Sequence, residues 1–196
     1  MNTIYIRMPR CGSTSIVHAC DRLNISSYGG RLMGFWGDGA LVKKKYSDNL
    51  CECVKNYVGT DVYDKSYKFT TVRNPYARAV SIFHHPSWKS VGTFNQFCID
   101  LINNNYPNQC AEFHSTRLTE HLVVDNQLQV DRILRLEDIQ DQFNDLCTML
   151  GEPRMRLIHA NKTDVKPYSD YYDGETYDII TEKYINDINT FNYSFK

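Results

Sequence analysis

The stretch Ile4-Tyr-Ile-Arg-Met-Pro-Arg-Cys-Gly-Ser-Thr-Ser-Ile16 decides the fold of this 196-residue chain. Its apolar start predicts a short β-strand, Pro9 ends that strand, and the small residues that follow predict a tight loop and a helix start. Backbone N–H groups at a helix N-terminus bind phosphate or sulfate, because they point at the ligand and carry partial positive charge. Arg10 adds a full charge, and Gly12 lets the backbone approach a ligand closely. The stretch therefore predicts an anion-binding loop.

This loop combines a guanidinium group with backbone N–H groups and side-chain hydroxyls. The candidate binding residues are Arg10, Cys11, Gly12, Ser13, Thr14 and Ser15. The spacing differs from two common phosphate loops. A Walker loop requires the pattern Gly-x-x-x-x-Gly-Lys-Ser/Thr, and only a glycine and the hydroxyl residues are present here. A phosphatase loop requires an arginine where this chain has Val17.

Composition narrows the classes of protein to consider. The chain is 42% hydrophobic and 23% charged with a net charge of -1, which is typical of a globular protein and predicts no nucleic-acid partner. No apolar run reaches the roughly 18 residues of a membrane helix, and the first strand begins close to Met1. We therefore expect one cytoplasmic domain over residues 1–196 with no membrane partner. The seven scattered cysteines are expected to be reduced packing residues.

Short strands alternate with helices along the chain, which predicts an α/β fold with a central parallel sheet and crossover helices. Strands are predicted at 3–8, 68–72 and 132–136. Helices are predicted at 14–23, 41–58, 75–84, 94–104, 137–150 and 173–189. Residues 24–40 contain five glycines and are predicted to form a loop.

A second motif follows the strand at 68–72. The run Val72-Arg-Asn-Pro-Tyr-Ala-Arg-Ala-Val-Ser81 places Arg73 at the end of the strand and Ser81 about two helical turns into the next helix. Ligands of parallel sheets bind at the carboxyl ends of the strands, so Arg73 and Arg10 are expected at the same edge. Arg78 is predicted to be a solvent-exposed helix residue.

The two motifs together resemble the sulfotransferase family that uses 3′-phosphoadenosine 5′-phosphosulfate (PAPS). Pro9-Arg-Cys-Gly-Ser-Thr-Ser15 is similar to the family's 5′-phosphosulfate loop, and Phe69-Thr-Thr-Val-Arg-Asn-Pro-Tyr-Ala-Arg-Ala-Val-Ser81 is similar to its 3′-phosphate motif. Arg135-Leu-Glu-Asp-Ile139 and the segment 161–193 resemble later parts of the carbohydrate sulfotransferases. The resemblance covers nearly the whole chain and implies a P-loop NTPase-like three-layer fold.

The resemblance also implies an activity and a set of roles. The enzyme would move a sulfuryl group from PAPS to an acceptor hydroxyl on a saccharide, release 3′-phosphoadenosine 5′-phosphate (PAP), and need no metal. Residues 10–15 would hold the 5′-phosphosulfate. Arg73 and Ser81 would hold the 3′-phosphate, and Lys162 would close over the nucleotide.

The chain departs from the family at two positions. The family usually has lysine where this chain has Arg10, which supplies charge but is a poor proton donor. The family's usual base, a histidine or glutamate after the first helix, is absent from Gly34-Phe-Trp-Gly-Asp-Gly39. The candidate bases are therefore Asp38, His18 and His114. His84 and His85, at a helix end, are predicted to cap the helix or lie at the surface.

Two other functions remain open at this point. A P-loop-like phosphotransferase is disfavoured because the chain lacks a Walker lysine and an obvious magnesium-binding carboxylate. A non-catalytic module that binds a nucleotide or a sulfated glycan is favoured by the missing family lysine and histidine. The sequence identifies neither the acceptor nor the oligomeric state.

Overall fold

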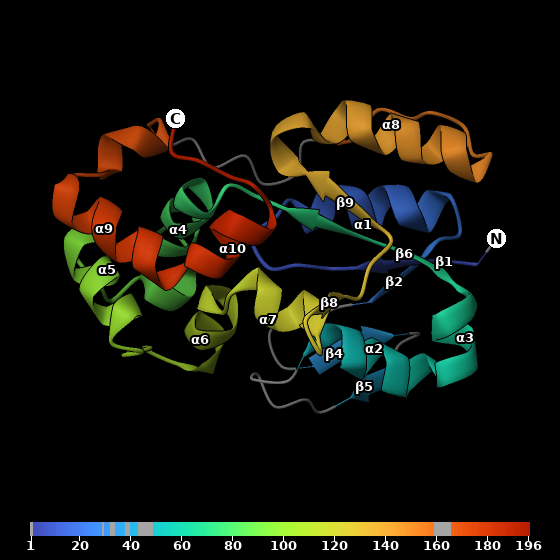
Figure 1. The fold of residues 1–196 in the computed structure, drawn as a ribbon, viewed down its shortest axis with the longest axis horizontal. Coiled ribbons are helices and arrows are strands. Elements are labelled where there is room, and N and C mark those ends of the chain that lie inside the picture. Colours follow the sequence, from blue (N-terminus) through green and yellow to red (C-terminus); the bar gives the residue numbers. More distant parts are fainter. Residues whose placement is uncertain (1, 29, 32–33, 38–39, 43–48, 159–165) are drawn as a thin grey trace.

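The computed structural model describes residues 2–28, 30–31, 34–37, 40–42, 49–158 and 166–196. Its central sheet has the strand order β2-β1-β6-β9, and all neighbouring strands are parallel. The four strands are β1 (Thr3–Ile6), β2 (Ser26–Tyr28), β6 (Tyr67–Val72) and β9 (Arg132–Arg135). The predicted α/β fold with a parallel sheet is confirmed (Figure 1).

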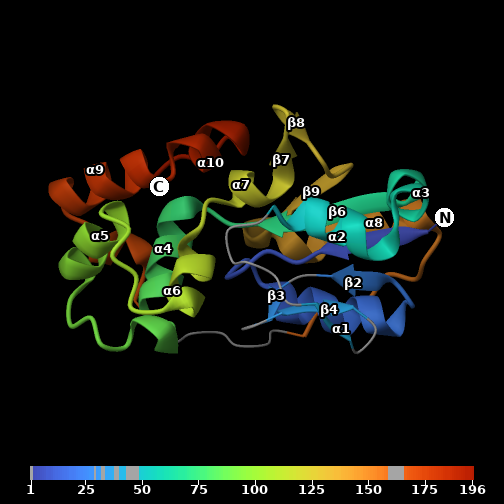
Figure 2. The same ribbon diagram turned by 90° about the horizontal axis from the view of Figure 1, so that it is seen from below.

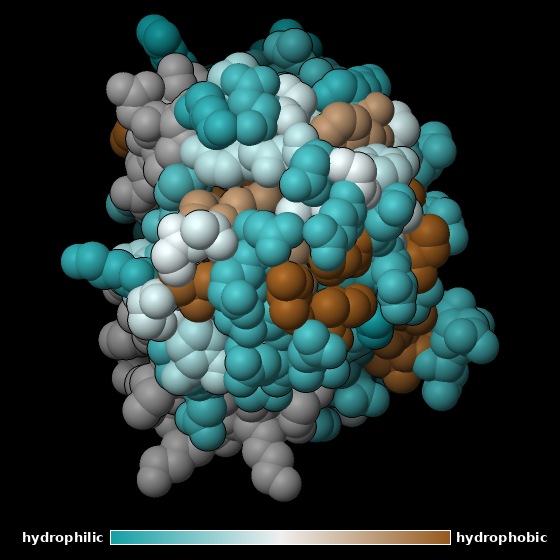
Figure 3. Space-filling view, turned by 90° about the vertical axis from the view of Figure 1, so that its left-hand side faces the viewer, coloured by the Kyte–Doolittle hydropathy of each residue, from teal (hydrophilic) through white to brown (hydrophobic). Residues whose placement is uncertain are grey.

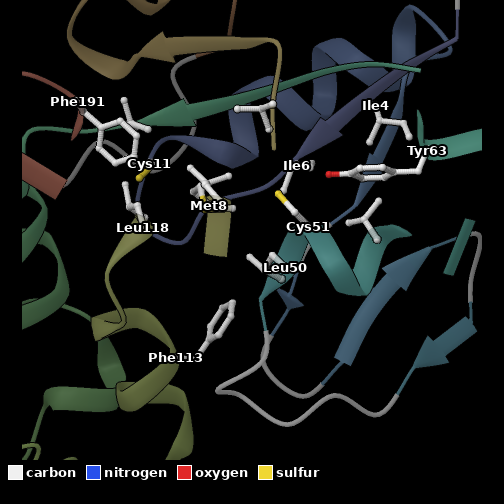
Figure 4. Packing of buried hydrophobic residues seen from close by; sticks show 14 residues of the cluster. Ile4, Ile6, Met8, Cys11, Leu50, Cys51, Tyr63, Phe113, Leu118 and Phe191 are labelled. Atoms are coloured by element: carbon white, nitrogen blue, oxygen red, sulfur yellow. The ribbon is translucent and has the colours of Figure 1, made fainter. Parts of the chain in front are cut away.

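Alternate side chains of β1 reach the two faces of the sheet, as the pleat requires. Ile4 and Ile6 pack with α2 (Leu50–Val58) and with Tyr63 of α3 (Thr60–Lys65) on one face (Figure 4). On the other face, Tyr5 packs with α1 (Ser13–Arg22) and α8 (Ile139–Leu150). The Tyr5 ring stacks on Phe69 with 4.9 Å between centroids. Helices on both faces give the predicted three layers.

A cluster of helices lies at the carboxyl end of the sheet, and Figures 1 and 2 show it on one side of the molecule. It comprises α4 (Pro75–Phe83), α5 (Phe94–Ile102), α6 (Gln109–Ser115), α7 (Leu118–Leu122), α9 (Gly174–Lys183) and α10 (Ile185–Thr190). Its core is rich in aromatic side chains, such as Trp88 edge-on against Phe97 at 4.7 Å. Figure 3 views this end of the molecule, where polar side chains dominate and apolar ones form small groups.

Short elements complete the fold. They are the strands β3 (Gly30–Arg31), β4 (Gly34–Gly37), β5 (Ala40–Val42), β7 (Val123–Val124) and β8 (Gln127–Leu128), and the 3-10 helices η1 (Pro86–Trp88), η2 (Leu136–Asp138) and η3 (Tyr168–Tyr171). Strands β3, β4 and β5 form an antiparallel sheet, and β7 pairs with β8. No helix in the described parts of the chain has the length and apolar character that crossing a membrane requires.

Three sequence predictions about elements were wrong. The segment 24–40 contains β2, which is an edge strand of the main sheet, and strands of the small sheet, so it is not simply a loop. The helix predicted at 41–58 begins only at Leu50, where Asn49 caps it by accepting the N–H of Cys51. The last helix is two helices separated at Tyr184, whose buried hydroxyl donates to the Ser115 carbonyl at 2.9 Å.

Candidate functional site

The loop between β1 and α1 has the backbone geometry of an anion-binding loop. Arg10 and Gly12 both have positive φ, at 62° and 71°. A Cβ on Gly12 would collide with the Leu136 side chain, so glycine suits this position for both conformation and space. Helix α1 begins at Ser13 with no side-chain cap and no acidic residue in its first turn. The N-terminus of α1 therefore faces the loop, and no acidic side chain of its first turn offsets its partial positive charge.

The two arginines predicted at the edge of the sheet meet there. Arg10 Nε and Nη2 donate to the Ser81 hydroxyl at 3.1 and 2.8 Å, which joins the first motif to the second. Arg73 Nη1 lies 3.5 Å from the Arg10 carbonyl oxygen. Within the described residues, neither guanidinium has a carboxylate within 4 Å, although both are half-buried. Burial lowers the pKa of both groups, and the charge of Arg73 further lowers the pKa of Arg10.

Cys11 lies in the same loop but turns its side chain away from it. The thiol is fully buried and points toward Met8, Leu118 and Phe191 in the core (Figure 4). Burial raises the pKa of Cys11 to about 12, so the thiol stays protonated, and it contacts the Pro9 carbonyl at 3.4 Å. Of the predicted binding residues, Cys11 can therefore offer only its backbone to a ligand.

Arg78 is buried, so the prediction that it faces solvent was wrong. Its Nε donates to the Pro9 carbonyl at 3.3 Å, and its Nη2 donates to the carbonyls of His114 and Thr116 at 2.8 Å each. Its Nη1 lies 3.8 Å from a carboxylate oxygen of Asp187, which is also buried. Arg78 therefore joins the anion-binding loop to the end of α6 and to α10, and it has no free face for a ligand.

The structure also brings His114 to this site. Its ring lies edge-on to His85, with 4.2 Å between centroids. Burial, then the neighbouring His85, then the charge of Arg10 lower the pKa of His114 to about 3, so the imidazole is neutral at pH 7. His85 caps η1 by accepting the Ser87 N–H at 3.2 Å, as its predicted capping role allows. Its contact with His114 was not predicted. His84 is exposed and bonds to the Tyr171 hydroxyl at 2.7 Å.

Of the other two candidate bases, the structure describes only His18, which does not join this group. His18 is exposed on α1. Asp38 and Lys162 lie outside the residues that the structure describes. Of the two candidate bases that the structure describes, His114 is the one whose pKa is affected by the charge of Arg10.

Sequence reasoning missed two residues that hold the Arg73 turn. Glu137 accepts the Asn74 backbone N–H at 2.8 Å through one carboxylate oxygen and the Tyr193 hydroxyl at 2.9 Å through the other. Asn74 caps α4 by accepting the Tyr76 N–H at 3.0 Å, and its amide donates to the Ser194 carbonyl at 2.9 Å. Asparagine directly before a helix that begins with proline is a capping signal that could have identified this role.

Comparison with known proteins places these motifs in a family. A search of curated proteins found no match. Among solved structures, the crystal structure of a sulfotransferase from Alicyclobacillus acidocaldarius is similar, at 13% identity and a TM-score of 0.47, over 96% of this chain and 93% of that one. The model of the sulfotransferase family matches residues 2–194, which is nearly the whole chain. The chain therefore belongs to the sulfotransferase family.

Proposed function

We propose that the protein transfers a sulfuryl group from PAPS to a hydroxyl group of a saccharide. The observation that carries this proposal is the pair Arg10 and Arg73, two half-buried arginines at the loop before the uncapped N-terminus of α1, where Arg73 Nη1 lies 3.5 Å from the Arg10 carbonyl oxygen. No carboxylate of the described residues lies within 4 Å of either one. Half-buried charges with no carboxylate in direct contact favour an anionic ligand, although Glu137 acts on Arg73 from farther away. A donor with anionic groups at both ends suits this arrangement.

The residues present fit such a donor. Arg10, Gly12 and the hydroxyl residues Ser13–Ser15 line the start of α1 and would hold the 5′-phosphosulfate. Arg73 and Ser81 would hold the 3′-phosphate. The hydrogen bonds from Arg10 to Ser81, at 2.8 Å for the shorter bond, support the assignment of both motifs to one donor. Any role of Lys162 in covering the nucleotide stays a prediction from the sequence.

These side chains can supply the parts that sulfuryl transfer needs. The donor supplies an activated sulfuryl group, whose bond to the phosphate oxygen breaks as the acceptor oxygen attacks sulfur. Arg10 would stabilise negative charge on the sulfuryl group and on the leaving phosphate. His114 would receive the proton of the acceptor hydroxyl, because its imidazole is neutral at pH 7. The charge of Arg10 lowers the basicity of this imidazole, and the anionic donor would offset that effect.

A polar pocket borders α6 on the side of the helix away from His114, and it offers groups of the kind that bind a saccharide. The pocket has a volume of about 540 Å³ and is lined by Asn104, Tyr106, Asn108, Gln109, Glu112 and Thr116. Amide, carboxylate and hydroxyl groups match the many hydroxyls of a sugar. Two lining residues, Gln109 and Glu112, lie on α6, the helix that carries His114. Lys183 fixes the rim by donating to Asn104 and Tyr106 at 2.8 and 3.0 Å.

Calorimetry with PAP, followed by transfer assays with radiolabelled PAPS and a panel of glycans, tyrosine peptides and small alcohols, tests the proposal. We expect PAP to bind and sulfate to appear on a glycan. Arg73→Ala should weaken PAP binding by about 1.5–3 kcal/mol, the range for hydrogen bonds to charged groups. Arg156→Ala is the matched control, because Arg156 is exposed and lies beyond α8, and it should leave PAP affinity unchanged.

The outcomes separate the alternatives. A folded wild-type protein that does not bind PAP would contradict the donor assignment. PAP binding without transfer to any acceptor would instead support a non-catalytic nucleotide-binding module. Transfer to tyrosine peptides or small alcohols alone would refute the saccharide acceptor and leave the donor assignment intact.

A further inference from the structure

Three side chains that commonly bind transition metals gather next to Arg10. His85, Cys110 and His114 each place one ligand atom within 4.8 Å of the other two. His85 comes from the turn between α4 and η1, and the other two residues come from α6. Cys110 and His114 are four residues apart on that helix, which puts them on the same face. This spacing on a helix is also common for paired zinc ligands.

The distances are close to those of a metal site. Cys110 Sγ lies 3.9 Å from His114 Nδ1. Zinc–sulfur and zinc–nitrogen bonds of about 2.3 and 2.0 Å in a tetrahedron separate such atoms by about 3.5 Å. Small side-chain rotations would therefore close the site. His85 Nδ1 faces Ser87, 2.8 Å from its hydroxyl and 3.2 Å from its backbone nitrogen. Metal binding through Nε2 requires the tautomer with the proton on Nδ1, which would donate to the Ser87 hydroxyl and give up the N–H contact.

The protonation states of the ligands agree with metal binding. The His114 imidazole is neutral at pH 7, as a metal ligand must be. Burial raises the pKa of Cys110, and a hydrogen bond with the Ser87 side chain partly lowers it again. A metal ion would displace the thiol proton to solvent and bind the thiolate. The resulting negative charge would partly offset the repulsion between the metal ion and Arg10.

We propose that His85, Cys110 and His114 form a binding site for Zn²⁺, with three protein ligands and one position open to water. A set of two imidazoles and one thiolate favours Zn²⁺ over the harder Mg²⁺ or Ca²⁺. This proposal departs from the sequence prediction, which was that the chain has no metal site. Bound zinc would also occupy the nitrogen of the proposed base, so it would inhibit transfer. The inhibition, unlike the binding, rests on the proposed function.

Cobalt titration of the protein after treatment with a chelator tests binding directly, because a thiolate bound to Co²⁺ gives a strong near-ultraviolet charge-transfer band. We expect this band in the wild type and its loss when Zn²⁺ is added. Cys110→Ser should lose the band and weaken zinc binding by at least about 100-fold. This loss exceeds the one expected when a residue that only orients a ligand is changed. Ser87→Ala should weaken zinc binding by about 10-fold. Cys53→Ser, which changes another half-buried cysteine on α2, is the control and should keep the band.

A transfer assay tests whether bound zinc inhibits sulfuryl transfer. Zinc should inhibit wild-type transfer, and folded Cys110→Ser should transfer normally but resist zinc. Absence of the cobalt band in the wild type, or its persistence in Cys110→Ser, would overturn the metal site. If the band appears as expected but metal-free protein transfers nothing, the proposed function fails and the metal site stands. If zinc binds and transfer is unaffected, the inhibition is wrong.

Discussion

At the scale of single residues, three arginines near the anion-binding loop differ in what surrounds them. Arg78 has carbonyl partners and the Asp187 carboxylate, and it is fully buried. Arg10 and Arg73 are half-buried and contact a hydroxyl and a carbonyl oxygen instead. Because a carboxylate already balances Arg78, that side chain stabilises the fold. Arg10 and Arg73 have no carboxylate of the described residues within 4 Å, which supports the proposal that they bind an anionic ligand.

Substitution of Arg10 separates its charge from its geometry. Arg10→Lys keeps the positive charge and restores the family's usual residue, but it loses the two-nitrogen contact with Ser81. We expect it to retain transfer within about 10-fold of wild type. Arg10→Met loses the charge and should reduce kcat by about 10²–10³-fold, comparable to loss of one oxyanion donor. Single-turnover assays with saturating PAPS measure this, and equal rates for Arg10→Met and wild type would exclude a catalytic charge at Arg10.

The sequence located Arg10, Arg73 and Ser81 correctly at one edge because parallel strands end there, whatever the rest of the chain does. It could not locate Arg78, because that residue is buried by α6 and α10, which follow much later in the chain. The proximity of His85 and His114 was beyond prediction for the same reason.

At the scale of elements, side-chain caps fix where several helices begin. Asn49, Asn74, Thr93, Asn108 and Asp173 each accept a backbone N–H at the start of a helix. Helix α1 has no side-chain cap, and neither do α3, α7, α8 and α10. The missing cap therefore does not by itself mark a ligand site. What sets α1 apart is that it begins in the loop that carries Arg10, where a cap would compete with an anion for the same N–H groups.

The capping box of α9 gives a pH-dependent prediction. Asp173 accepts the Thr176 N–H at 2.8 Å and its hydroxyl at 2.7 Å, and these bonds lower the pKa of Asp173. A carboxyl with a lowered pKa in the folded state contributes stability above its unfolded pKa of 3.8, and loses it as the pH falls through the folded value. Asp173→Ala should therefore lower Tm by a few degrees at pH 7 and by less at pH 3. Thermal unfolding monitored by circular dichroism gives the Tm at both pH values. An equal loss of Tm at pH 7 and pH 3 would rule out the charged cap.

Strong periodic patterns predicted the helices well, and weak ones did not. Helix α8 ends at Gly151 with φ 76°, as its glycine indicated. The short strands between residues 26 and 42 were missed because glycine disfavours strands locally, whereas pairing of Ile4 with Ser26 overrides that preference. Tyr184 interrupts the last helix because its side chain is buried against Ser115, a contact invisible to sequence periodicity.

At the scale of the whole molecule, the pair Arg78 and Asp187 connects the sheet to the helical cluster. Arg78 contacts the Pro9 carbonyl beyond β1 and the carbonyls that end α6. Asp187 accepts the backbone N–H groups of Leu118 and Thr119 at 2.8 and 2.9 Å, at the start of α7. The pair therefore fixes the anion-binding loop relative to α6, α7 and α10.

Loss of either partner should destabilise the fold strongly, because it leaves the other charge buried and unpaired. Arg78→Met or Asp187→Asn should lower the free energy of unfolding by about 3–5 kcal/mol. The double variant should lose clearly less free energy of unfolding than the two single variants lose together, since neither charge is left buried without its partner. Urea unfolding of all four proteins measures the coupling. Purely additive losses would show that the 3.8 Å separation carries no energetic interaction.

The strand order β2-β1-β6-β9 also sets the order in which the chain can fold during synthesis. Strand β1 is made first, but its partner β6 begins at Tyr67 and β9 begins only at Arg132. Until β6 leaves the ribosome, β1 exposes an unpaired edge and an apolar face, and such long-range pairing is slow. The nascent chain is therefore most prone to aggregation early in translation, before Arg73 has joined the sheet edge that carries Arg10.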